Sequence, residues 1–474
     1  MAKKDPHMLM DEYIARIDRL PSWGLSNSVL WAIGFSYFIT LYDAVGNLGT
    51  ALPYVPFLTP QEQSTILAMG LISYIPGAII LGYLSDLIGR RNMLIYTIIL
   101  IAIGSVGMAL SVDYNTLLFF RIIEGAGIGG DLVITAVYIV EYAPALKRGI
   151  YMNWIYIAGW IAVGGGAAFT GILVQSLPTI GWRIAFGIAA ALAIAAIVLR
   201  ISAPESIRFL VKNGRMLEAE RLTRHMEEIV ISKLSVPKLP EYKSLSYEHD
   251  HRNPFRIVIK RFYLKRFIGL LIFWFTIYMV QYTFSGFWGG YLQLLGITGD
   301  LFNRVSILTA YSAVGATMMA FLMLLFIDKV DRRLLIQIGS LGWLIGVSLS
   351  AVAVVQQNWA LMFLLQLLVS NFLGGGLSYL AGYLISAESF PTSARATGFA
   401  LTDGLGHLGG GVGALLIVPL IKSLGSILPW VIISFPVVIG AGLLWVLLPR
   451  TVGYRLEEIN EVMEREVMLK SKIR

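Results

Sequence analysis

The sequence has no cysteine and little charge. None of its 474 residues is Cys, and only 14% are Asp, Glu, Lys or Arg, whereas a typical soluble domain has about 25%. Without cysteine the chain can form neither disulfide bonds nor thiolate metal sites, and it has no cysteine nucleophile. Its five histidines include His249 and His251, which we interpret as solvated loop residues. We therefore expect no metal site and no cofactor.

Motifs of several functional classes are also missing or misplaced. No G-x-x-x-x-G-K-(S/T) motif occurs, which argues against an ATP-driven pump, and the apolar runs hold no nucleophile or metal cluster that would suggest an enzyme. The stretch 125–130 (GAGIGG) fits the dinucleotide pattern G-x-G-x-x-G, but no strand precedes it, so its glycines are predicted to pack transmembrane helices. The net charge of +8 is spread over loop ends, which disfavours nucleic-acid binding.

Long apolar runs make up most of the chain. Hydrophobic residues account for 57% of it and the mean hydropathy is +0.72. Each run is near the roughly 20 residues that cross a bilayer as a helix. We predict an all-α integral membrane protein with twelve transmembrane helices, at residues 27–50, 63–84, 92–112, 115–140, 150–174, 182–203, 266–295, 303–327, 334–355, 359–386, 395–422 and 427–448.

Three charged motifs occur twice at a nearly constant spacing, which indicates duplication. Asp-x-x-x-Arg-Arg begins at Asp86 and again 242 positions later, Glu-x-x-Pro-x-x-x-Arg begins at Glu141 and again 247 positions later, and Pro-x-(Ser/Thr) begins at Pro204 and again 245 positions later. Repeats of this length are sub-domains of several helices. The predicted organisation is a tail (1–26), a six-helix bundle (27–203), a central loop with amphipathic helices (204–265), a second six-helix bundle (266–448) and a second tail (449–474).

Basic residues predict the orientation of the helices. If the N-terminus is cytoplasmic, the cytoplasmic segments contain 32 of the 37 Lys and Arg residues, and the opposite loops contain only Arg183, Arg304 and Lys422. The positive-inside rule therefore places both termini and the central loop in the cytoplasm of a multi-pass plasma-membrane protein. Residues 1–20 have no apolar core, so we expect no cleaved signal peptide. Residues 215–229 form an amphipathic stretch, which predicts a helix on the inner face of the membrane.

Several titratable residues lie inside predicted spans, where a buried charge costs a few kcal/mol or more and indicates function. Asp43 and Arg121 both lie roughly 10 Å below the outer surface, at 1.5 Å rise per residue, so they can meet. Glu124 shares a helix face with Arg121 and could share the arginine or hold a second proton. The complete set is Asp43, Arg121, Glu124, Asp131, Asp403 and His407.

The motifs together resemble the major facilitator superfamily. The stretch 82–91 resembles its signature between helices 2 and 3. Within the superfamily, Arg121 with its following glycines and the stretches 141–149, 204–210 and 388–395 are similar to the sugar porters and their metabolite:proton relatives. The resemblance covers about residues 27–460. It implies the major facilitator fold and a secondary transporter that rocks one half against the other.

The resemblance also implies roles for the intramembrane charges. Asp43 and Arg121 match a proton-coupling pair, in which separation from the arginine lets the aspartate take up a proton; the alternative is a static ion pair. The sequence Gly129-Gly130-Asp131 resembles the phosphate:proton symporters, and Asp131 and Glu124 are further candidate proton sites. His407 falls where anion-transporting relatives carry a basic residue, and the alternative is a packing hydrogen bond with Asp403.

The duplicated loop motifs are predicted to form a cytoplasmic gate. An acid at a helix end, facing arginines and helix termini of its neighbours, can form charge-assisted hydrogen bonds in one conformation and lose them in another. The alternative is that these residues only anchor helix ends. The predicted gate residues are Asp86, Arg90, Arg91, Glu141, Arg148, Glu205, Asp328, Arg332, Glu388 and Arg395.

Polar and aromatic residues near the middle of the spans are candidates for the substrate site. Tyr379 and Tyr383 match positions where sugar porters carry tryptophan, and Trp160 lies near the place of a sugar-porter glutamine. The full set is Asn153, Tyr156, Trp160, Gln281, Tyr282, Trp288, Asn371, Tyr379, Tyr383, Asp403 and His407. We expect a monomeric, proton-coupled importer of a sugar or sugar-like metabolite, or alternatively a symporter of an organic anion, an aromatic acid or phosphate.

Overall fold

The computed structural model describes residues 6–144, 147–235, 238–242, 254–297, 299–391 and 394–453. The first half of the bundle contains six membrane-crossing segments. The first runs through α2 (Asn27–Leu41), the π-helical turn η1 (Tyr42–Asn47), α3 (Leu48–Ala51) and the short turn η2 (Leu52–Tyr54). The others are α4 (Pro60–Ile88), α5 (Arg90–Leu110), α6 (Tyr114–Tyr142), α7 (Arg148–Ser176) and α8 (Gly181–Ile201).

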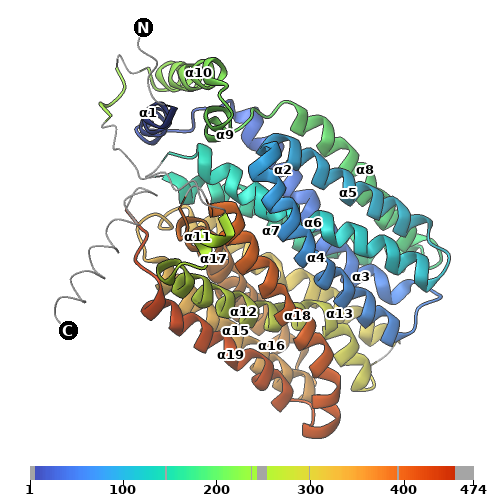
Figure 1. Cartoon of the computed structure of the whole chain (residues 1–474). Coiled ribbons are helices and arrows are strands. Elements are labelled where there is room, and N and C mark those ends of the chain that lie inside the picture. The colour runs from blue at the N-terminus through green and yellow to red at the C-terminus, as the bar shows by residue number, and fades with distance from the viewer. Residues whose placement is uncertain are drawn as a thin grey trace.

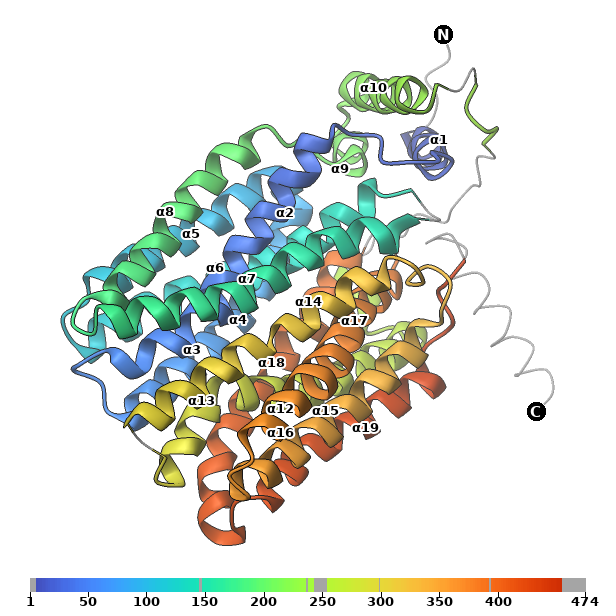
Figure 2. The same cartoon turned by 180° about the vertical axis from the view of Figure 1, so that it is seen from behind.

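The second half repeats this arrangement. It comprises α12 (Arg261–Leu294), the pair α13 (Gly299–Ser312) and α14 (Val314–Met323), α15 (Arg332–Val355), the segment α16 (Trp359–Leu364), η4 (Leu365–Gly375) and α17 (Gly376–Glu388), then α18 (Arg395–Leu424) and α19 (Leu428–Leu447). The two halves lie side by side (Figures 1 and 2) and meet along α4 with α18 and along α7 with α13 and α14.

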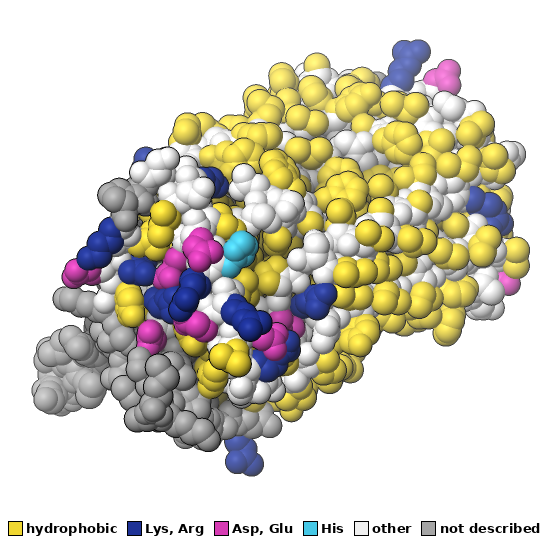
Figure 3. Space-filling model, turned by 90° about the horizontal axis from the view of Figure 1, so that it is seen from above, with side chains coloured by type: hydrophobic (Ala, Val, Ile, Leu, Met, Phe, Trp, Pro, Cys, Tyr) yellow, Lys and Arg dark blue, Asp and Glu magenta, His cyan; other side chains and the backbone are white. Residues whose placement is uncertain are grey.

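The expected twelve spans correspond to twelve helical segments. Among the described residues, eleven segments are long and apolar enough to cross a membrane. The remaining one, α6, is 29 residues long and carries four charged residues: Arg121, Glu124, Asp131 and Glu141. It packs between α4 and α5, so its charges are surrounded by protein. Exposed apolar side chains cover much of the bundle surface in Figure 3, as a bilayer-facing surface requires.

Glycines allow α6 to pack closely against its neighbours. A Cβ atom at Gly129 would lie 2.2 Å from the carbonyl oxygen of Tyr74 in α4, and one at Gly125 would lie 2.5 Å from that of Gly70. A Cβ atom at Gly127 would lie 2.9 Å from the backbone nitrogen of Ile101 in α5. The stretch 125–130 is therefore a helix-packing surface, as predicted, and no strand precedes it.

A group of helices covers one end of the bundle. It consists of α1 (Pro6–Asp18), α9 (Ile207–Lys212), α10 (Met216–Leu234) and α11 (Pro254–Val258), and its charged side chains gather there in Figure 3. The amphipathic helix predicted at 215–229 is α10, whereas α1 was not predicted. Arg16 of α1 forms ion pairs with Glu220 and Glu227 of α10, both at 2.7 Å. We call this end of the bundle the gate end, because the duplicated loop motifs lie there.

Candidate functional site

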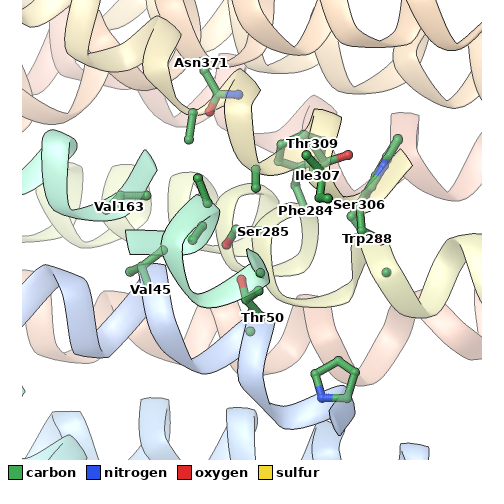
Figure 4. A pocket seen from close by; sticks show the side chains of 18 of the residues that line it. Val45, Thr50, Val163, Phe284, Ser285, Trp288, Ser306, Ile307, Thr309 and Asn371 are labelled. Carbon is green, nitrogen blue, oxygen red and sulfur yellow. The ribbon is translucent and has the colours of Figure 1, made fainter. Parts of the chain in front are cut away.

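A cavity of about 160 Å³ lies between the two halves. It is bounded by η1, α3, η2 and α7 of the first half and by α12, α13, α15 and η4 of the second (Figure 4). Tyr54, Gln175 and Phe302, which line it, stand near helix ends remote from the gate end. The cavity therefore lies toward the end of the bundle opposite the gate.

Aromatic rings and unpaired polar atoms line this cavity. The rings belong to Tyr54, Trp160, Phe284, Trp288, Phe302 and Trp343. Among the described residues, five polar atoms of the lining are buried without a protein hydrogen-bond partner: Trp160 Nε1, Gln281 Oε1, Trp288 Nε1, Ser306 Oγ and Trp343 Nε1. Buried polar groups are normally paired, so these atoms are available to bind a ligand or water. The lining combines apolar faces with a few hydrogen-bonding groups, as small-molecule sites do.

Four of the eleven predicted substrate residues line this cavity: Trp160, Gln281, Trp288 and Asn371. The Asn371 amide donates to Ser312 Oγ at 3.0 Å and to the Gln366 carbonyl oxygen at 2.9 Å, within the π-helical segment η4. A π-helical turn changes the direction of side chains and is frequent at functional sites. Asn371 is thus already held by its own half, whereas Gln281 presents a free oxygen.

A smaller cavity of about 40 Å³ adjoins the first and extends toward the intramembrane charges. Val45, Gly49 and Ser285 line both cavities, and Arg121 and Tyr282 line only the smaller one. Tyr282 is therefore the fifth predicted substrate residue at a cavity wall. The two cavities together connect the interface between the halves with Arg121.

Arg121 forms its ion pair with Glu124, one turn away on α6. Asp43, in the π-helical turn η1, accepts a hydrogen bond from Ser105 Oγ at 2.6 Å, and the same hydroxyl lies 3.1 Å from Glu124 Oε1. The Asp43 and Glu124 carboxyl groups are within hydrogen-bonding reach of each other. The expected direct pair of Asp43 and Arg121 is replaced by a cluster in which Arg121 binds Glu124 and Ser105 contacts both buried carboxyl groups.

The charges of this cluster balance only when it holds one proton. Glu124 is fully buried and Asp43 is 1% exposed, and the second oxygen of Asp43 has no hydrogen-bond partner among the described residues. With both carboxyl groups ionised, Arg121 balances only one of the two negative charges. Two carboxylates in one buried site repel each other, so one proton held between them removes the uncompensated charge.

Asp131 is placed differently from the other acids. Arg200 of α8 binds both of its carboxylate oxygens, one of them at 3.0 Å, and Thr40 and Thr97 donate to them at 2.7 and 2.8 Å. Arg200 also donates to Ser36 Oγ at 2.6 Å. Asp131 and Arg200 are almost completely buried, and neither lines the cavities described above. This fully paired group joins four helices, which favours a structural role for Asp131 over proton coupling.

Asp403 and His407 lie in an aromatic cluster between the halves. Asp403 accepts hydrogen bonds from Tyr74 of α4 and Tyr278 of α12, both at 2.5 Å. His407 Nδ1 lies 2.8 Å from the backbone carbonyl oxygen of Asp403 and 4.0 Å from its carboxylate, and Tyr282 Oη lies 3.1 Å from His407 Nε2. The expected packing contact between the two residues therefore exists, but it uses the Asp403 backbone.

The remaining predicted substrate residues pack in or near this cluster, away from the cavity walls. Tyr383 lies 3.3 Å from the Tyr278 hydroxyl, and the rings of Tyr379 and Tyr383 flank Trp274. Asn153 of α7 donates to the Ala320 carbonyl oxygen of α14 at 2.7 Å, and so connects the halves. Tyr156 packs against Trp160 and Tyr383. None of these four residues is among those that line the two cavities.

In the first half, the gate residues form one connected network. Arg90 contacts Asp86 at 2.6 Å and Glu141 at 3.3 Å, and Ser206 Oγ donates to Glu141 at 2.5 Å. Arg91 donates to the Ile201 carbonyl oxygen at 2.6 Å.

Glu205 completes the network by binding the start of α5. It accepts the backbone N–H groups of Arg90 at 2.9 Å and Arg91 at 3.3 Å. Burial raises the pKa of the Glu205 carboxyl, although these hydrogen bonds oppose the shift. Gly89 is required here because its φ is +108° and a Cβ atom would lie 2.2 Å from Glu205 Oε2.

Two equivalent acids contact the opposite half. Asp328 accepts the backbone N–H groups of Gly149 and Ile150 at the start of α7, both at 3.1 Å. Asp86 accepts a hydrogen bond from Thr397 near the start of α18 at 3.3 Å. Each half thus presents one acid to a helix N-terminus of the other half, where a negative charge is favoured.

The other second-half gate residues mirror the first half. Arg332 contacts Asp328 at 3.2 Å and Glu388 at 3.6 Å, and Arg395 lies close enough to Glu141 to interact electrostatically. The side chain of Arg148 and both residues of the pair His249 and His251 lie outside the described residues.

Sequence reasoning missed Arg200, Ser105 and Tyr74. Arg200 lies near the predicted cytoplasmic end of its span, where the positive-inside rule already explains a basic residue. The sequence therefore did not indicate that Arg200 pairs with Asp131. Ser105 and Tyr74 are uncharged, so the pattern of charged residues does not include them. Ser105 contacts Asp43, which is 62 positions away, and Tyr74 contacts Asp403, which is 329 positions away. Only the packing of α2, α4, α5 and α18 places them there.

Comparisons with known proteins agree with this geometry. Solved structures of the proton:xylose symporter XylE are similar in fold; one, bound to 6-bromo-6-deoxy-D-glucose, gives a TM-score of 0.71 at 22% identity, covering 92% of this chain and 98% of that one. A niacin transporter of Acinetobacter baylyi is 26% identical over 409 residues, 84% of this chain and 88% of that protein. An arabinose-proton symporter of Bacillus subtilis is 27% identical over 340 residues, 68% of this chain and 70% of that protein.

A family model described as "Sugar (and other) transporter" matches residues 22–463. The match spans both six-helix halves, the interface cavity and the gate motifs. A multi-pass membrane transporter of small molecules, rather than an enzyme, is thereby confirmed. The chain belongs to the sugar (and other) transporter family.

Proposed function

We propose that this protein couples the inward movement of a proton to uptake of a sugar or sugar-like small metabolite by alternating access. The observation that carries the proposal is the position of the Asp43–Glu124–Arg121 cluster. It adjoins a cavity at the interface between the halves, so that a proton and a substrate bind in contact with the same moving parts. The solved proton:xylose symporter structures share this fold.

The cluster suggests how the proton acts. When Asp43 and Glu124 share a proton, the cluster is neutral and Arg121 stays bound to Glu124. Loss of the proton leaves a second negative charge, which draws the Arg121 guanidinium toward Asp43 and away from Glu124. Because Arg121 lines the smaller cavity, this movement changes the wall that faces the substrate. Glu124 is therefore part of the proton site, together with Asp43.

The larger cavity supports a small, uncharged or weakly charged substrate. Its volume of about 160 Å³ is below the roughly 300–1,000 Å³ of pockets for drug-sized ligands. Trp160, Gln281, Trp288, Ser306 and Trp343 offer hydrogen bonds, and no Lys or Arg among the described residues is part of its lining. These features suit the hydroxyl groups and apolar faces of a monosaccharide or inositol, and a myo-inositol transporter of Schizosaccharomyces pombe is 25% identical to the chain.

An aromatic acid such as niacin is the second candidate. The ring-rich lining favours a planar ligand, and Arg121 at the adjoining cavity can attract its carboxylate. The niacin transporter of A. baylyi supports this alternative. Phosphate is the weakest candidate, because Asp131, which suggested it, is fully paired with Arg200 away from both cavities.

We further propose that the gate end faces the cytoplasm of a plasma-membrane monomer, with both termini inside. The distribution of Lys and Arg supports this orientation. In that orientation the cross-half contacts of Asp328 and Asp86 close the cytoplasmic side, and the gate acts as a latch rather than as a set of helix anchors. Because the chain has no cysteine, single cysteines introduced at Asn92 and at Leu110 can be tested with a thiol reagent that does not cross the membrane. In intact cells, only the cysteine at position 110 should react.

Binding and transport tests separate the substrate candidates. The purified protein should be stabilised against heat by its substrate in a screen of D-xylose, L-arabinose, myo-inositol, niacin and phosphate, because a ligand that binds only the folded state raises its stability. In proteoliposomes, the stabilising ligand should accumulate when a proton gradient is imposed.

Variants of the proton site test the coupling itself. Asp43→Asn and Glu124→Gln should each keep exchange of labelled substrate across equal concentrations but lose gradient-driven accumulation. Asp113→Asn is the control, since it also neutralises an acid of the first half, but an exposed one at the start of α6, where asparagine caps a helix as well as aspartate does. Accumulation that survives in Asp43→Asn at the wild-type level would refute the proposal.

A further inference from the structure

The aromatic cluster around Asp403 contains an acid that the proposed proton site does not use. Asp403 is fully buried on α18 of the second half and lines neither cavity. Its two oxygens accept hydrogen bonds from different halves of the molecule. Oδ2 accepts from Tyr74 of α4 in the first half, and Oδ1 accepts from Tyr278 of α12 in the second half.

His407 is the basic side chain nearest to Asp403 among the described residues, so its protonation state decides whether the carboxylate has a close cation. The backbone carbonyl of Asp403 can only accept, so the proton between them must lie on His407 Nδ1. Because His407 is 1% exposed and burial favours the uncharged form of the ring, its Nε2 atom accepts the Tyr282 proton. The Nδ1 atom is 4.0 Å from the Asp403 carboxylate, beyond hydrogen-bonding distance.

The neighbouring elements also contribute no fixed charge in the part of the chain that the structure describes. The titratable groups that face Asp403 are tyrosines from α4 (Tyr74), α12 (Tyr278 and Tyr282), α17 (Tyr379 and Tyr383) and α2 (Tyr37), together with His407 of α18 itself. Arg121 interacts electrostatically only with Tyr282 of this group, through the wall of the smaller cavity. An ionised Asp403 is therefore stabilised mainly by two phenol hydroxyls.

We propose that Asp403 is a second proton-binding site, distinct from the Asp43–Glu124 cluster, and that its protonation loosens the contact between α4 and α18. While ionised, the carboxylate accepts a charge-assisted hydrogen bond from Tyr74, and such bonds are about twice as strong as neutral ones. A proton placed on Oδ2 occupies the position of the Tyr74 hydrogen. Tyr74 must then turn its hydroxyl away or act as an acceptor, and the bond between the halves weakens.

The hydrogen bonds that Tyr74 and Tyr278 donate to Asp403 respond differently to movement of the halves. The bond to Tyr278 stays within the second half, so its strength does not depend on how the halves are placed. The bond to Tyr74 exists only while α4 and α18 are together. Protonation of Asp403 therefore changes the balance between conformations, and this proposal rests on the alternating-access function proposed above.

The test measures distances between the halves in the full-length protein and needs no known substrate. Cysteines introduced at the exposed positions Leu110 of α5 and Val355 of α15 carry spin labels, and the absence of native cysteine makes this labelling specific. We expect the ratio of the two conformations in detergent to change about tenfold between pH 5 and pH 8, the difference expected between a charge-assisted and a neutral hydrogen bond.

Four variants assign this change to Asp403. Asp403→Asn should show the low-pH distribution at every pH. Tyr74→Phe should likewise remove the pH response, whereas Tyr278→Phe should move its midpoint and keep it. Asp43→Asn should lose proton-driven accumulation but keep the pH response attributed to Asp403. Elution as a single monodisperse peak establishes that each variant is folded.

Several outcomes would overturn the proposal. These are a wild-type distribution that does not change with pH, an Asp403→Asn variant that titrates like the wild type, or Tyr278→Phe and Tyr74→Phe variants that behave alike. Loss of the response in His407→Gln alone would assign the switch to the histidine instead. If Asp43→Asn keeps accumulation while Asp403→Asn abolishes the pH response, the proposed coupling site fails and the Asp403 site stands.

Discussion

At the residue scale, the buried charges differ in how completely they are paired. Asp131 and Arg200 satisfy each other with the help of Thr40, Thr97 and Ser36. Asp43 and Glu124 share one arginine, and Asp403 relies on tyrosine hydroxyls. A fully paired charge resists change, whereas an incompletely paired one gains a proton readily. For this reason we propose a structural role for Asp131 and proton binding for the other acids.

Removal of one partner of the structural pair should destabilise the protein strongly. Arg200→Met leaves the Asp131 charge buried and unpaired, which costs about 3–5 kcal/mol in comparable buried pairs. The double variant Arg200→Met with Asp131→Asn should recover part of this loss. Thermal melting in detergent, followed by size-exclusion chromatography, measures both. Arg183→Met, on the same helix but partly exposed, is the control; equal losses in Arg200→Met and Arg183→Met would contradict the argument.

At the element scale, close helix packing depends on glycines and on docked surface helices. The glycines of α6 bring it within backbone contact of α4 and α5, which lets Arg121, Glu124 and Asp131 reach their partners. The helix α1 docks on α10 through Arg16 and Arg19, both bound to Glu227. Trp23, which follows α1, is fully buried, packs against the tilted ring of Tyr151 of α7 and donates its backbone N–H to the Tyr151 hydroxyl. The gate-end helices are thus attached to a helix that carries the gate.

Substitution of Gly129 should prevent the packing of α6 on α4. In Gly129→Ala the new Cβ atom would lie 2.2 Å from the Tyr74 carbonyl oxygen, which forces the backbones apart. We expect a loss of about 1–3 kcal/mol, as for other overpacked cores. The yield of monodisperse protein and its melting temperature provide the measurement. Gly187→Ala in α8 has open space around its Cβ and should be tolerated; similar yields for the two variants would argue against this packing.

The docking of α1 should be lost in acid. Burial alone would raise the pKa of Glu227, but hydrogen bonds from Arg16 and Arg19 outweigh it and lower that pKa. A lowered folded-state pKa means that the stabilisation is complete above the usual carboxyl value of about 4.3 and is lost as the pH falls through the lowered value. Hydrogen exchange of residues 11–18, corrected for intrinsic rates, should therefore accelerate below about pH 4.

The same exchange should be fast at pH 7 in Arg16→Ala, which removes the contacts with Glu220 and Glu227. Arg215→Ala is the matched control, because its partner Glu218 is exposed and such surface pairs contribute little. If residues 11–18 exchange equally in the two variants, the ion pairs do not hold α1 in place.

At the scale of the whole molecule, two related halves meet at the gate end and at a cavity nearer the opposite end. Two acids contact the opposite half at the gate end: Asp328 binds the start of α7, and Asp86 binds Thr397 near the start of α18. Both are contacts with a helix N-terminus, so both favour the ionised acid. The duplicated motifs thus produce one pair of equivalent contacts around the pseudo-twofold axis.

Loss of one cross-half acid should shift the conformational balance. Asp328→Ala removes two charge-assisted hydrogen bonds to α7, so we expect the population that is open at the gate end to rise about tenfold. Spin labels at the equivalent positions Asn92 and Leu334 should move apart. Asp331→Ala, three residues away, removes an acid that binds Arg333 within its own half and should leave the distance unchanged. Equal distances in the two variants would show that Asp328 only anchors a helix end.

The sequence by itself determined the class of this protein. Apolar runs near the length of a bilayer predicted every membrane-crossing segment, because a lipid solvent demands continuous apolar helices, and the repeated motifs revealed the two halves. Tertiary structure decided which charges are partners. Asp43 faces Ser105 and Glu124, Arg200 faces Asp131, and Tyr74 faces Asp403, because side-chain contacts between helices depend on helix rotation and depth, which hydropathy does not specify. The sequence therefore named the charged residues, and packing decided which of them are left free to bind a proton.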